Sequence, residues 1–517
     1  MLRRSLALYR QKKITKPTLQ AVLEGTKKQV MDAVYDTLGS LPPRLLNTHT
    51  GAICNRDALI SAFENSQQCE QLLLSAKTRP TALPDIYDTV STYFKYVTLS
   101  HRWGKDEPLL RDIQDQSIYE MNPTDGRVKL ETFCATAGSR GYLWAWSDTC
   151  CIDKSSTVEL AKAIASMFSW YRRSALTIVY LADVSSDGNL SSSTWFTRGW
   201  TLQELLAPCT VLFYTRDWSL YKNLESSNHK KDTVVLSELE KATSIAPWSL
   251  TDFKPGMDDA RSRLQWASGR RTTEPEDVAY SLFGIFNVFL PIIPGEPAEN
   301  ALGRFLAEII SQSGDISVLD WIGEASSFHS CFPAQITSYQ TTPCSQCTVH
   351  DSELWRPMSG TQDAQIKLFK RLSTSDPPQF IGRRLRLSCI VHQVIAVQSQ
   401  QGDPYAPQYV YTIEADGLIP FEITMSNELT RTDTSHTLLP YVLIRPWHSK
   451  LLRSFTRALG VAAPELVMML GQPFSALLLE EQSGNEYTRI ASSSLIIARP
   501  ADASNILKSE VQTLNIA

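Results

Sequence analysis

The sequence predicts an α/β fold: a doubly wound, mostly parallel sheet with a helical extension, followed by a β-rich C-terminal domain. Three observations predict it. Between residues 96 and 214, short apolar segments alternate with helical ones, as in a parallel sheet covered by helices on both faces. Helical patterns then continue to about residue 311. Beyond residue 335, short β-branched runs with turn signals predominate, which favours a β-sandwich or a barrel-like module.

The composition favours a cytoplasmic protein. The 517 residues, 43% of them hydrophobic, suffice for two or three cores. The 50 basic and 54 acidic side chains nearly cancel, so an electrostatic grip on nucleic acid is not expected. Polar residues and a proline interrupt the longest apolar run, residues 278–294, so no membrane span is expected. The ten cysteines form no disulfide framework, which indicates a reducing compartment. The basic first thirteen residues are expected to be a solvated end, with a mitochondrial targeting segment as the alternative.

We expect three parts along the chain. Residues 1–40 form a helical lead-in, residues 41–335 the α/β domain with its helical extension, and residues 336–517 the β-rich domain. The strands expected in the α/β domain are Tyr96–Ser100, Tyr142–Trp146, Thr177–Leu181 and Thr210–Tyr214.

A capping signal locates the main helix between these strands. Ser156 and Glu159 have the spacing of a capping box, and apolar residues follow at helical intervals up to Tyr171. A shorter helix is expected over Trp195–Leu206, stopped by Pro208.

The helical extension is expected from Leu236 to about Phe286, with a further helix at Glu299–Ser311. Thr273 and Glu276 have the spacing of a second capping box and predict the start of its last helix before Phe286. The candidate strands beyond it are Leu385–Val397, Tyr409–Glu414, Ile419–Ile423, Leu438–Ile444, Phe474–Glu480 and Tyr487–Ala498, with a hairpin turn at Gly484 and Asn485.

Polar and aromatic residues gather in three segments of the α/β domain. Thr98–Gly104 and Ser147–Lys154 each follow a short apolar run, and Thr197–Leu206 is typical of the start of a helix. Residues just past the carboxyl ends of parallel strands line the binding crevices of open α/β sheets. The candidate binding residues are Ser100, His101, Arg102, Trp103, Asp148 and Trp200.

Glu204 is the candidate catalytic residue. It follows Trp200 by four residues, so both side chains lie on one face of a helix. A carboxylate beside an indole is partly desolvated, which suits acid, base or cation-stabilising chemistry. The alternative is an exposed helix glutamate bonded to a neighbouring arginine. Arg102 also has two interpretations, a bidentate phosphate contact and an ion pair with Asp106.

Other chemistries have weaker support in the sequence. Cys150, with His101 as its base, supplies the ingredients of a cysteine hydrolase, but adjacent cysteines at an apolar strand end are more often buried packing groups. Cys344 and Cys347 with His350 hint at zinc, yet a single CxxC pair is a weak signal, and no metal site is predicted. The chain contains neither a P-loop motif nor a GxGxxG motif.

Long blocks of the sequence resemble the fungal heterokaryon-incompatibility (HET) domain. They are YVTLSHRWG from residue 96, SDTCCIDKSSTVELAKAIASMFSWYRRSA from residue 147 and STWFTRGWTLQELLAP from residue 193. LQWASGRRTTEPEDVAYSLFGIFNV resembles the segment that follows the domain in one large subgroup, and RLLNTHTGAICNRDALISAFENS resembles a lead-in. The likeness covers about residues 41–322, whereas residues 335–517 match no family we can name.

The resemblance implies a role in fungal non-self recognition and programmed cell death, and a distant relation to TIR domains. In catalytic TIR domains a glutamate supports cleavage of the nicotinamide–ribose bond of NAD, and Glu204 is the matching position. Ser100, Arg102 and Trp103 would then bound the nucleotide, and Asp148 would face it. NAD is expected as a substrate, and no cofactor is expected.

The chain departs from the family in two respects. Pro294-Gly295-Glu296-Pro297 stands where many relatives have Tyr-Gly-Glu-Gly, which alters a loop outside the expected site. No NTPase module or repeat array accompanies the domain, so the activating signal is unknown.

Two functions therefore stay open at this point. One is a NAD-cleaving death effector that assembles as a homo-oligomer on an unknown protein trigger. The other is a non-enzymatic adaptor that acts by self-association, for which exposure of Trp195, Trp200 and Trp218 would be a hint, although core packing is the expected role of these residues.

Overall fold

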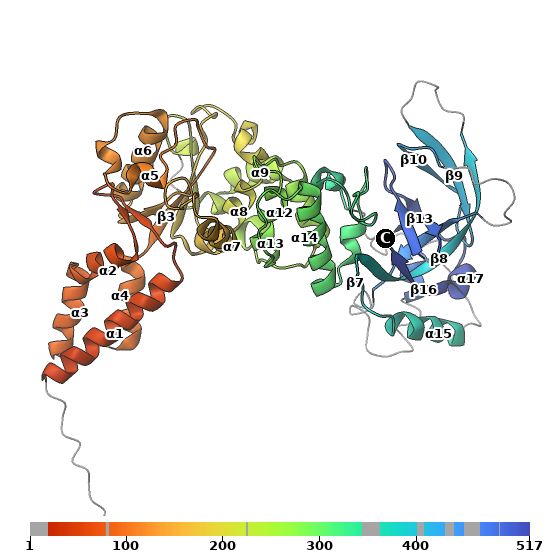
Figure 1. The fold of residues 1–517 in the computed structure, drawn as a ribbon, viewed down its shortest axis with the longest axis horizontal. Helices are drawn as coiled ribbons and strands as arrows, with labels where there is room; N and C mark the ends of the chain where they lie inside the picture. Colours follow the sequence, from red (N-terminus) through yellow and green to blue (C-terminus); the bar gives the residue numbers. More distant parts are fainter. Residues whose placement is uncertain are drawn as a thin grey trace, which may run out of the picture. The chain divides into compact units, whose positions relative to one another are not determined.

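The computed structural model describes residues 19–78, 82–223, 226–343, 362–400, 408–429, 439–448, 466–484 and 486–517. The chain divides into two compact units. The first comprises residues 1–163, 169–186 and 208–229, and the second comprises residues 164–168, 187–207 and 230–517. Each unit is described by itself below, and Figure 1 labels their helices and strands.

The first unit contains a six-stranded sheet in the order β2-β1-β4-β3-β5-β6. Its strands are β1 (Leu45–Asn47), β2 (Ile53–Cys54), β3 (Tyr96–His101), β4 (Trp144–Trp146), β5 (Leu176–Tyr180) and β6 (Val211–Tyr214). The pairs β3–β4, β3–β5 and β5–β6 are parallel, whereas β1 is antiparallel to β2 and β4. The prediction of a mostly parallel sheet is confirmed, and the TIR-like, doubly wound class stays a prediction.

The order of the parallel strands creates a switch in direction beside β3. The chain leaves β3 for β4 on one side and then crosses to β5 on the other side. In open α/β sheets ligands bind outside the carboxyl ends of strands at such a point. The residues that follow β3 and β4 are therefore the ones to inspect for a site.

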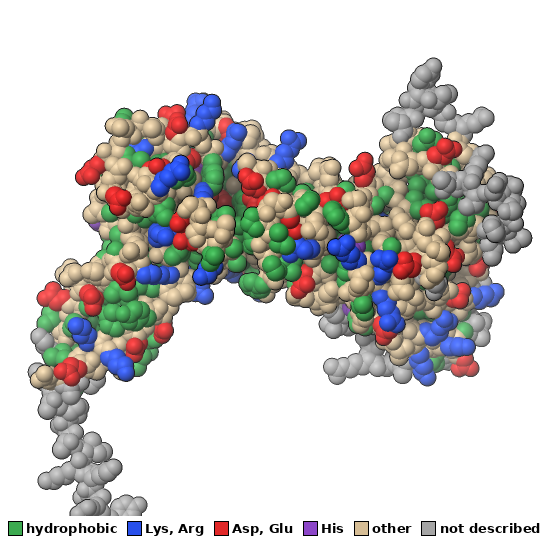
Figure 2. Space-filling model, viewed as in Figure 1, with side chains coloured by type: hydrophobic (Ala, Val, Ile, Leu, Met, Phe, Trp, Pro, Cys, Tyr) green, Lys and Arg blue, Asp and Glu red, His purple; other side chains and the backbone are tan. Residues whose placement is uncertain are grey.

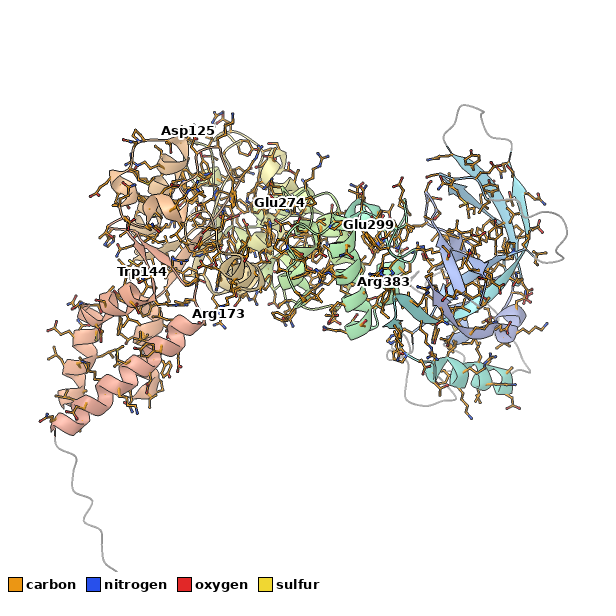
Figure 3. All side chains as sticks on the ribbon, in the orientation of Figure 1. Asp125, Trp144, Arg173, Glu274, Glu299 and Arg383 are labelled. Atoms are coloured by element: carbon orange, nitrogen blue, oxygen red, sulfur yellow. The ribbon has the colours of Figure 1, made fainter. Side chains whose placement is uncertain are left out.

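The helices of the first unit fall into two groups. The lead-in consists of α1 (Leu19–Gly39), α2 (Arg56–Glu64), α3 (Gln67–Thr78) and α4 (Leu83–Tyr93). The sheet helices are α5 (Leu110–Ile113), the short η1 (Ile118–Glu120), α6 (Asp125–Ser139) and α7 (Thr157–Arg173), which leads from β4 to β5. The Ser156 hydroxyl accepts from Glu159 N at 3.3 Å, so the predicted cap of α7 is confirmed. A tryptophan-rich core lies under this sheet, with Trp144 (Figure 3) and Trp146 fully buried.

The second unit begins with short helices. They are η2 (Leu190–Ser192), η3 (Thr194–Thr197), α8 (Thr201–Leu206), α9 (Thr233–Thr243), α10 (Pro247–Thr251), α11 (Ala260–Ser268), α12 (Asp277–Tyr280), α13 (Phe283–Phe286), α14 (Ala298–Ser313), η6 (Ile316–Leu319) and η7 (Ile336–Tyr339).

Two predictions about these helices are wrong. The helix predicted over Trp195–Leu206 is interrupted, because the backbone at Gly199 donates to Arg271 O at 2.8 Å and so leaves the helical path. The capping box predicted at Thr273 does not form. The Glu276 carboxylate accepts from Gly295 N instead, and α12 begins one residue after Glu276 without a side-chain cap.

The rest of the second unit is rich in β-structure, as predicted. Its elements are α15 (Gln362–Ser373), β7 (Gln379–Ile381), β8 (Arg384–Ser399), β9 (Tyr409–Ala415), β10 (Phe421–Met425), β11 (Tyr441–Pro446), β12 (Phe474–Ser475), β13 (Leu477–Gln482), β14 (Glu486–Ile490), β15 (Ile497–Ala498), α17 (Ala503–Lys508) and β16 (Glu510–Ile516). The pairings β8–β11–β13–β14–β16–β8 close a ring of strands, and the buried side chains of Leu387, Ile444 and Leu479 share one face of it. The division of the chain at residue 335 stays a prediction.

Buried Arg489 of β14 joins this β-rich part to the helical part of the same unit. Its guanidinium donates to Leu319 O at 2.8 Å and to Trp321 O at 3.0 Å. It also lies 3.7 Å from the centroid of the Trp321 ring. Ser330 N donates to the carbonyl of Ala517 nearby, at 3.0 Å.

Candidate functional site

Four side chains at or just past the carboxyl ends of β3 and β4 form what we call the strand-end cluster: His101, Trp103, Asp148 and Lys154. Trp103 Nε1 donates to Asp148 Oδ2 at 3.0 Å. The ammonium of Lys154 lies 3.3 Å from the centroid of the Trp103 ring. The structure thus brings together three predicted binding residues and adds Lys154.

The sheet and one glycine hold the cluster in place. Thr98 and Trp146 are register partners in β3 and β4, so His101 and Asp148 come after the same edge of the sheet. The loop after β3 packs on the first turn of α6 because Gly126 has no side chain. A Cβ atom there would lie 2.0 Å from Asp106 O. The loop that carries Trp103 therefore depends on a close backbone approach.

The Lys154 ammonium is buried and forms no hydrogen bond with any described residue. Burial lowers the pKa of Lys154, while the charges of Asp148, Cys150 and Glu107 act in the opposite direction. A desolvated cation on an indole face is stabilised by about 2 kcal/mol. The indole therefore substitutes in part for the acceptors that this ammonium lacks.

Asp148 and His101 are shifted toward their neutral forms. Burial raises the pKa of the Asp148 carboxyl, against the lowering effects of Lys154 and of the Trp103 N–H group. Burial, with the Lys129 and Lys154 cations, lowers the pKa of His101 well below 6.5. The imidazole is therefore neutral near pH 7, and its Nε2 lies 3.6 Å from Glu107 Oε1.

Glu107 and Lys129 form an ion pair under the loop that follows β3. The same carboxylate accepts from Gly104 N at 2.6 Å. Lys129 Nζ is also 3.5 Å from the carbonyl oxygen of Arg102. This pair neutralises itself and supports the loop, so it leaves Lys154 as the cation of the cluster without an acceptor among the described residues.

The remaining predicted residues of the first unit behave differently. Ser100 is fully buried within β3. Arg102 is exposed, and its side chain forms no ion pair with Asp106 or with any other described residue. Cys150 is fully buried, and its hydrogen bond with Cys151, followed by burial, raises the pKa of its thiol well above 9.0. With the pKa of His101 lowered as well, the pair does not support a thiolate nucleophile.

Glu204 and Trp200 belong to the second unit. Glu204 is only 6% exposed, so the interpretation as an exposed helix glutamate is wrong. Arg270 lies close enough for the Glu204 charge to raise its pKa, although burial dominates and lowers that pKa to about 9. The Arg270 guanidinium donates to Arg198 O at 2.9 Å and to Thr201 Oγ1 at 3.0 Å. Glu204 therefore has a charged arginine as its electrostatic partner.

Trp200 contacts a carboxylate that titrates near neutral pH. Its Nε1 donates to Asp277 Oδ2 at 2.8 Å. Burial, the largest cause, raises the pKa of Asp277 to about 6. The Asp277 carboxyl of the folded protein therefore stays protonated at pH values where the same carboxyl in an unfolded chain is ionised.

We expect Asp277→Asn to remove a pH dependence of stability. Between about pH 4 and pH 6 the native state binds more protons than the unfolded state, so wild-type stability falls as pH rises through this window. The side chain of the Asn variant does not titrate. Between about pH 4 and pH 6, the free energy of unfolding of the variant should therefore increase relative to that of wild type by about 1 to 2 kcal/mol. Thermal unfolding at pH 4.5 and pH 7 measures the difference. The exposed Asp252→Asn serves as the control, and equal pH responses of Asp277→Asn and wild type would contradict the assignment.

Three residues of these sites were missed in the sequence: Lys154, Lys129 and Arg270. Lys154 lies inside the Ser147–Lys154 segment, so its place after a strand was the available signal. Lys129 and Arg270 carry no local signal, because their partners are 22 and 69 residues distant in the chain.

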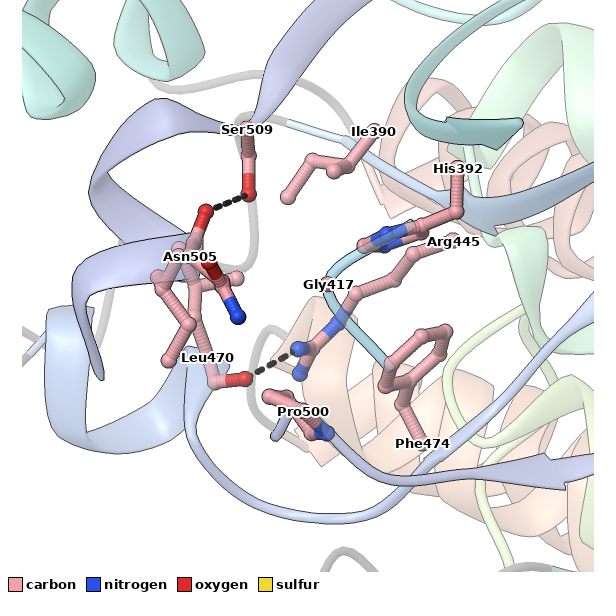
Figure 4. A pocket seen from close by; sticks show the side chains of 10 residues that line it. Ile390, His392, Gly417, Arg445, Leu470, Phe474, Pro500, Asn505 and Ser509 are labelled. Carbon is pink, nitrogen blue, oxygen red and sulfur yellow. Dashed lines mark hydrogen bonds between the residues drawn. The ribbon is translucent and has the colours of Figure 1, made fainter. Parts of the chain in front are cut away.

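Neither of two cavities lined by described residues adds a ligand site. A cavity of about 10 Å³ lies beside Arg445 and Phe474 in the β-rich part (Figure 4), where Arg445 donates to Leu470 O at 2.6 Å. It has room for about one water molecule. A cleft of about 510 Å³ is lined by carboxylates, of which Asp315 accepts from Ala260 N and Ser317 N and so serves the backbone.

The described residues show neither a metal site nor a membrane-spanning helix. Within the described ranges no three His, Cys, Asp or Glu side chains are grouped to hold a metal ion. Cys344, Cys347 and His350 lie outside the described residues. None of the helices in the described parts has the length and apolar character to span a membrane. Basic and acidic side chains are interspersed over the visible face of these residues (Figure 2).

Comparison with known proteins identifies a similar family over part of the chain. Residues 96–192, which contain β3, β4, β5 and the strand-end cluster, match the family model described as heterokaryon incompatibility protein (HET). Residues 96–192 are therefore similar to a HET domain, as the sequence blocks in this part of the chain predict.

A curated relative shows the same similarity. Over 246 residues the chain is 40% identical to vegetative incompatibility protein HET-E-1 of Podospora anserina. The aligned part covers 44% of this chain and 17% of the relative, so the chain spans well under two thirds of that protein. No solved structure matches the chain significantly.

Proposed function

We propose that this protein acts in fungal vegetative incompatibility as a HET-domain effector of cell death. The observation that carries the proposal is the HET domain itself, together with a relative that is named a vegetative incompatibility protein. Because the relative extends far beyond the aligned part, its other activities are not transferred here.

The chemistry we propose is cleavage of the nicotinamide–ribose bond of NAD. The strand-end cluster supports a ligand with an aromatic group and negative charge. Trp103 is 45% exposed and offers a stacking face, while Arg102 is exposed and Lys154 provides a second cation. The cluster follows β3 and β4, at the edge where open α/β sheets bind ligands.

Glu204 is the proposed catalytic residue. An ionised carboxylate stabilises an oxocarbenium-like transition state, as in glycoside hydrolysis. Arg270 supplies a buried positive charge near Glu204. In this role the glutamate needs its charge, so an isosteric amide should not replace it.

Expression of the full chain in fungal cells tests the proposal. We expect loss of viability together with loss of cellular NAD, and we expect Glu204→Gln to restore both. Exposed Glu240→Gln of α9 is the matched control and should remain toxic. The full chain is required, because Arg261 of α11 bonds to Tyr339 O and Thr341 O, beyond the division predicted near residue 335.

The same experiment separates the adaptor function. An adaptor would kill cells with NAD unchanged, and Glu204→Gln would remain toxic if it folds. Trp195 and Trp218 do not support self-association. Trp195 is buried, and the ring of Trp218 stacks on the ring of Tyr180 with 4.5 Å between the centroids. Two other aromatic side chains, Trp248 and Phe289, are 71% and 73% exposed and keep the adaptor as the second candidate.

A further inference from the structure

We propose that Lys154 is an anion-binding residue whose ammonium receives a phosphate group once the Trp103 indole moves off it. The inference rests on the proposed nucleotide ligand and names the part of the ligand that this side chain would take. Neither the family match nor the named relative assigns a role to Lys154.

The N–H donors of the Lys154 ammonium are unused by the described residues. An ammonium has three N–H donors, and none of them is accepted by a described residue although Nζ is buried. A buried donor without an acceptor is unfavourable, and such a group in a native structure calls for an explanation. A phosphate group, with several acceptor oxygens and negative charge, satisfies all three donors.

The charged neighbours of Lys154 are engaged with other groups. Lys129 is paired with Glu107, so it does not compete for the anion. Asp148 has the largest acidic influence on Lys154, and its carboxylate accepts the Trp103 N–H group instead of an ammonium hydrogen. The cluster thus leaves one cation available.

Lys154 lies close to the amino end of a helix. It lies two residues before Ser156, the N-cap of the 17-residue helix α7. The amino end of a helix favours anions through its free N–H groups and its dipole. The residue also follows β4 at the edge of the sheet where ligands bind.

Trp103 covers the Lys154 ammonium but is itself partly exposed. Its ring covers the ammonium at 3.3 Å, while almost half of its surface is exposed. One hydrogen bond, from Nε1 to Asp148, fixes the indole. A side chain held by one hydrogen bond and one cation–π contact can be displaced by a ligand that offers Lys154 a full negative charge.

Calorimetric titration of the purified full chain with inorganic pyrophosphate tests the inference. Wild type should bind pyrophosphate, and Lys154→Met should weaken binding at least tenfold, whereas Lys154→Arg should keep it within about threefold. Trp103→Ala should bind several-fold more tightly than wild type, because the ammonium is no longer covered. Exposed Lys105→Met, in the loop after β3, is the matched control and should bind as wild type does.

Three results would overturn the inference. They are unchanged binding in folded Lys154→Met, equal loss in Lys105→Met, and absence of binding in both wild type and Trp103→Ala. Circular dichroism establishes that each variant is folded, and Lys154→Gln provides a second neutral variant. If binding depends on Lys154 while NAD stays intact, the phosphate site stands and NAD cleavage fails. If NAD is cleaved but Lys154→Met binds pyrophosphate as wild type does, NAD cleavage stands and the phosphate site at Lys154 fails.

Discussion

Replacing Arg270 by methionine is expected to destabilise the second unit by about 3 to 5 kcal/mol, which is the usual effect of removing one partner of a buried charge pair. The guanidinium is buried, and it donates to Arg198 O and Thr201 Oγ1. Methionine has similar bulk but no donors. It would leave these acceptors and the buried charge of Glu204 without their partner.

Thermal and urea unfolding of Arg270→Met measure this effect. Arg271→Met is the matched control, because Arg271 is the next residue and is exposed. The double variant Glu204→Gln/Arg270→Met should recover part of the loss, since the unpaired carboxylate is gone. An Arg270→Met protein within 1 kcal/mol of wild type would show that the two groups do not depend on each other.

Replacing Arg489 by methionine is expected to destabilise the junction between the helical and β-rich parts of the second unit by about 2 to 4 kcal/mol. Two backbone carbonyls, of Leu319 and Trp321, would lose their donor in a buried place. The cation–π contact with the Trp321 ring would be lost as well. Burial lowers the pKa of Arg489 to about 10, so the side chain is still a cation at pH 7.

Limited proteolysis and thermal unfolding measure the Arg489 effect. We expect faster cleavage near residues 319–332 in Arg489→Met than in wild type. Arg499→Met is the matched control, because Arg499 lies in the same β-rich part but is exposed. Identical proteolysis of Arg489→Met and wild type would mean that the junction is held by other contacts.

The strands of the parallel sheet could be predicted because each is a short apolar run between polar segments. β3, β5 and β6 begin or end within one residue of their predicted bounds. The antiparallel strands β1 and β2 were missed, since they are three and two residues long and too short to show alternation. Local pattern therefore predicts buried central strands better than short edge strands.

The two wrong helix predictions have a common cause. Gly199 and Glu276 both bond to backbone groups far along the chain, Arg271 O and Gly295 N. Tertiary hydrogen bonds of this kind override local capping and periodicity, and nothing in the neighbouring sequence signals them.

The candidate site could be predicted in part. The rule that ligands gather at strand ends placed Trp103 and Asp148 together, and the structure shows them hydrogen bonded. The same rule could not give the role of Lys154, since its contact with the Trp103 ring depends on the packed loop. The interaction of Glu204 with Arg270 could not be predicted either, because Arg270 lies just past the end of α11, 66 residues later in the chain.

Release of nicotinamide from NAD by the purified full chain is the direct measurement of the proposed reaction. We expect nicotinamide and ADP-ribose in equal amounts with wild type, and release at least about 100-fold slower with folded Glu204→Gln. Glu240→Gln should release nicotinamide as wild type does. Wild-type protein that kills cells but leaves NAD intact in this assay, or Glu204→Gln that cleaves NAD at the wild-type rate, would contradict it.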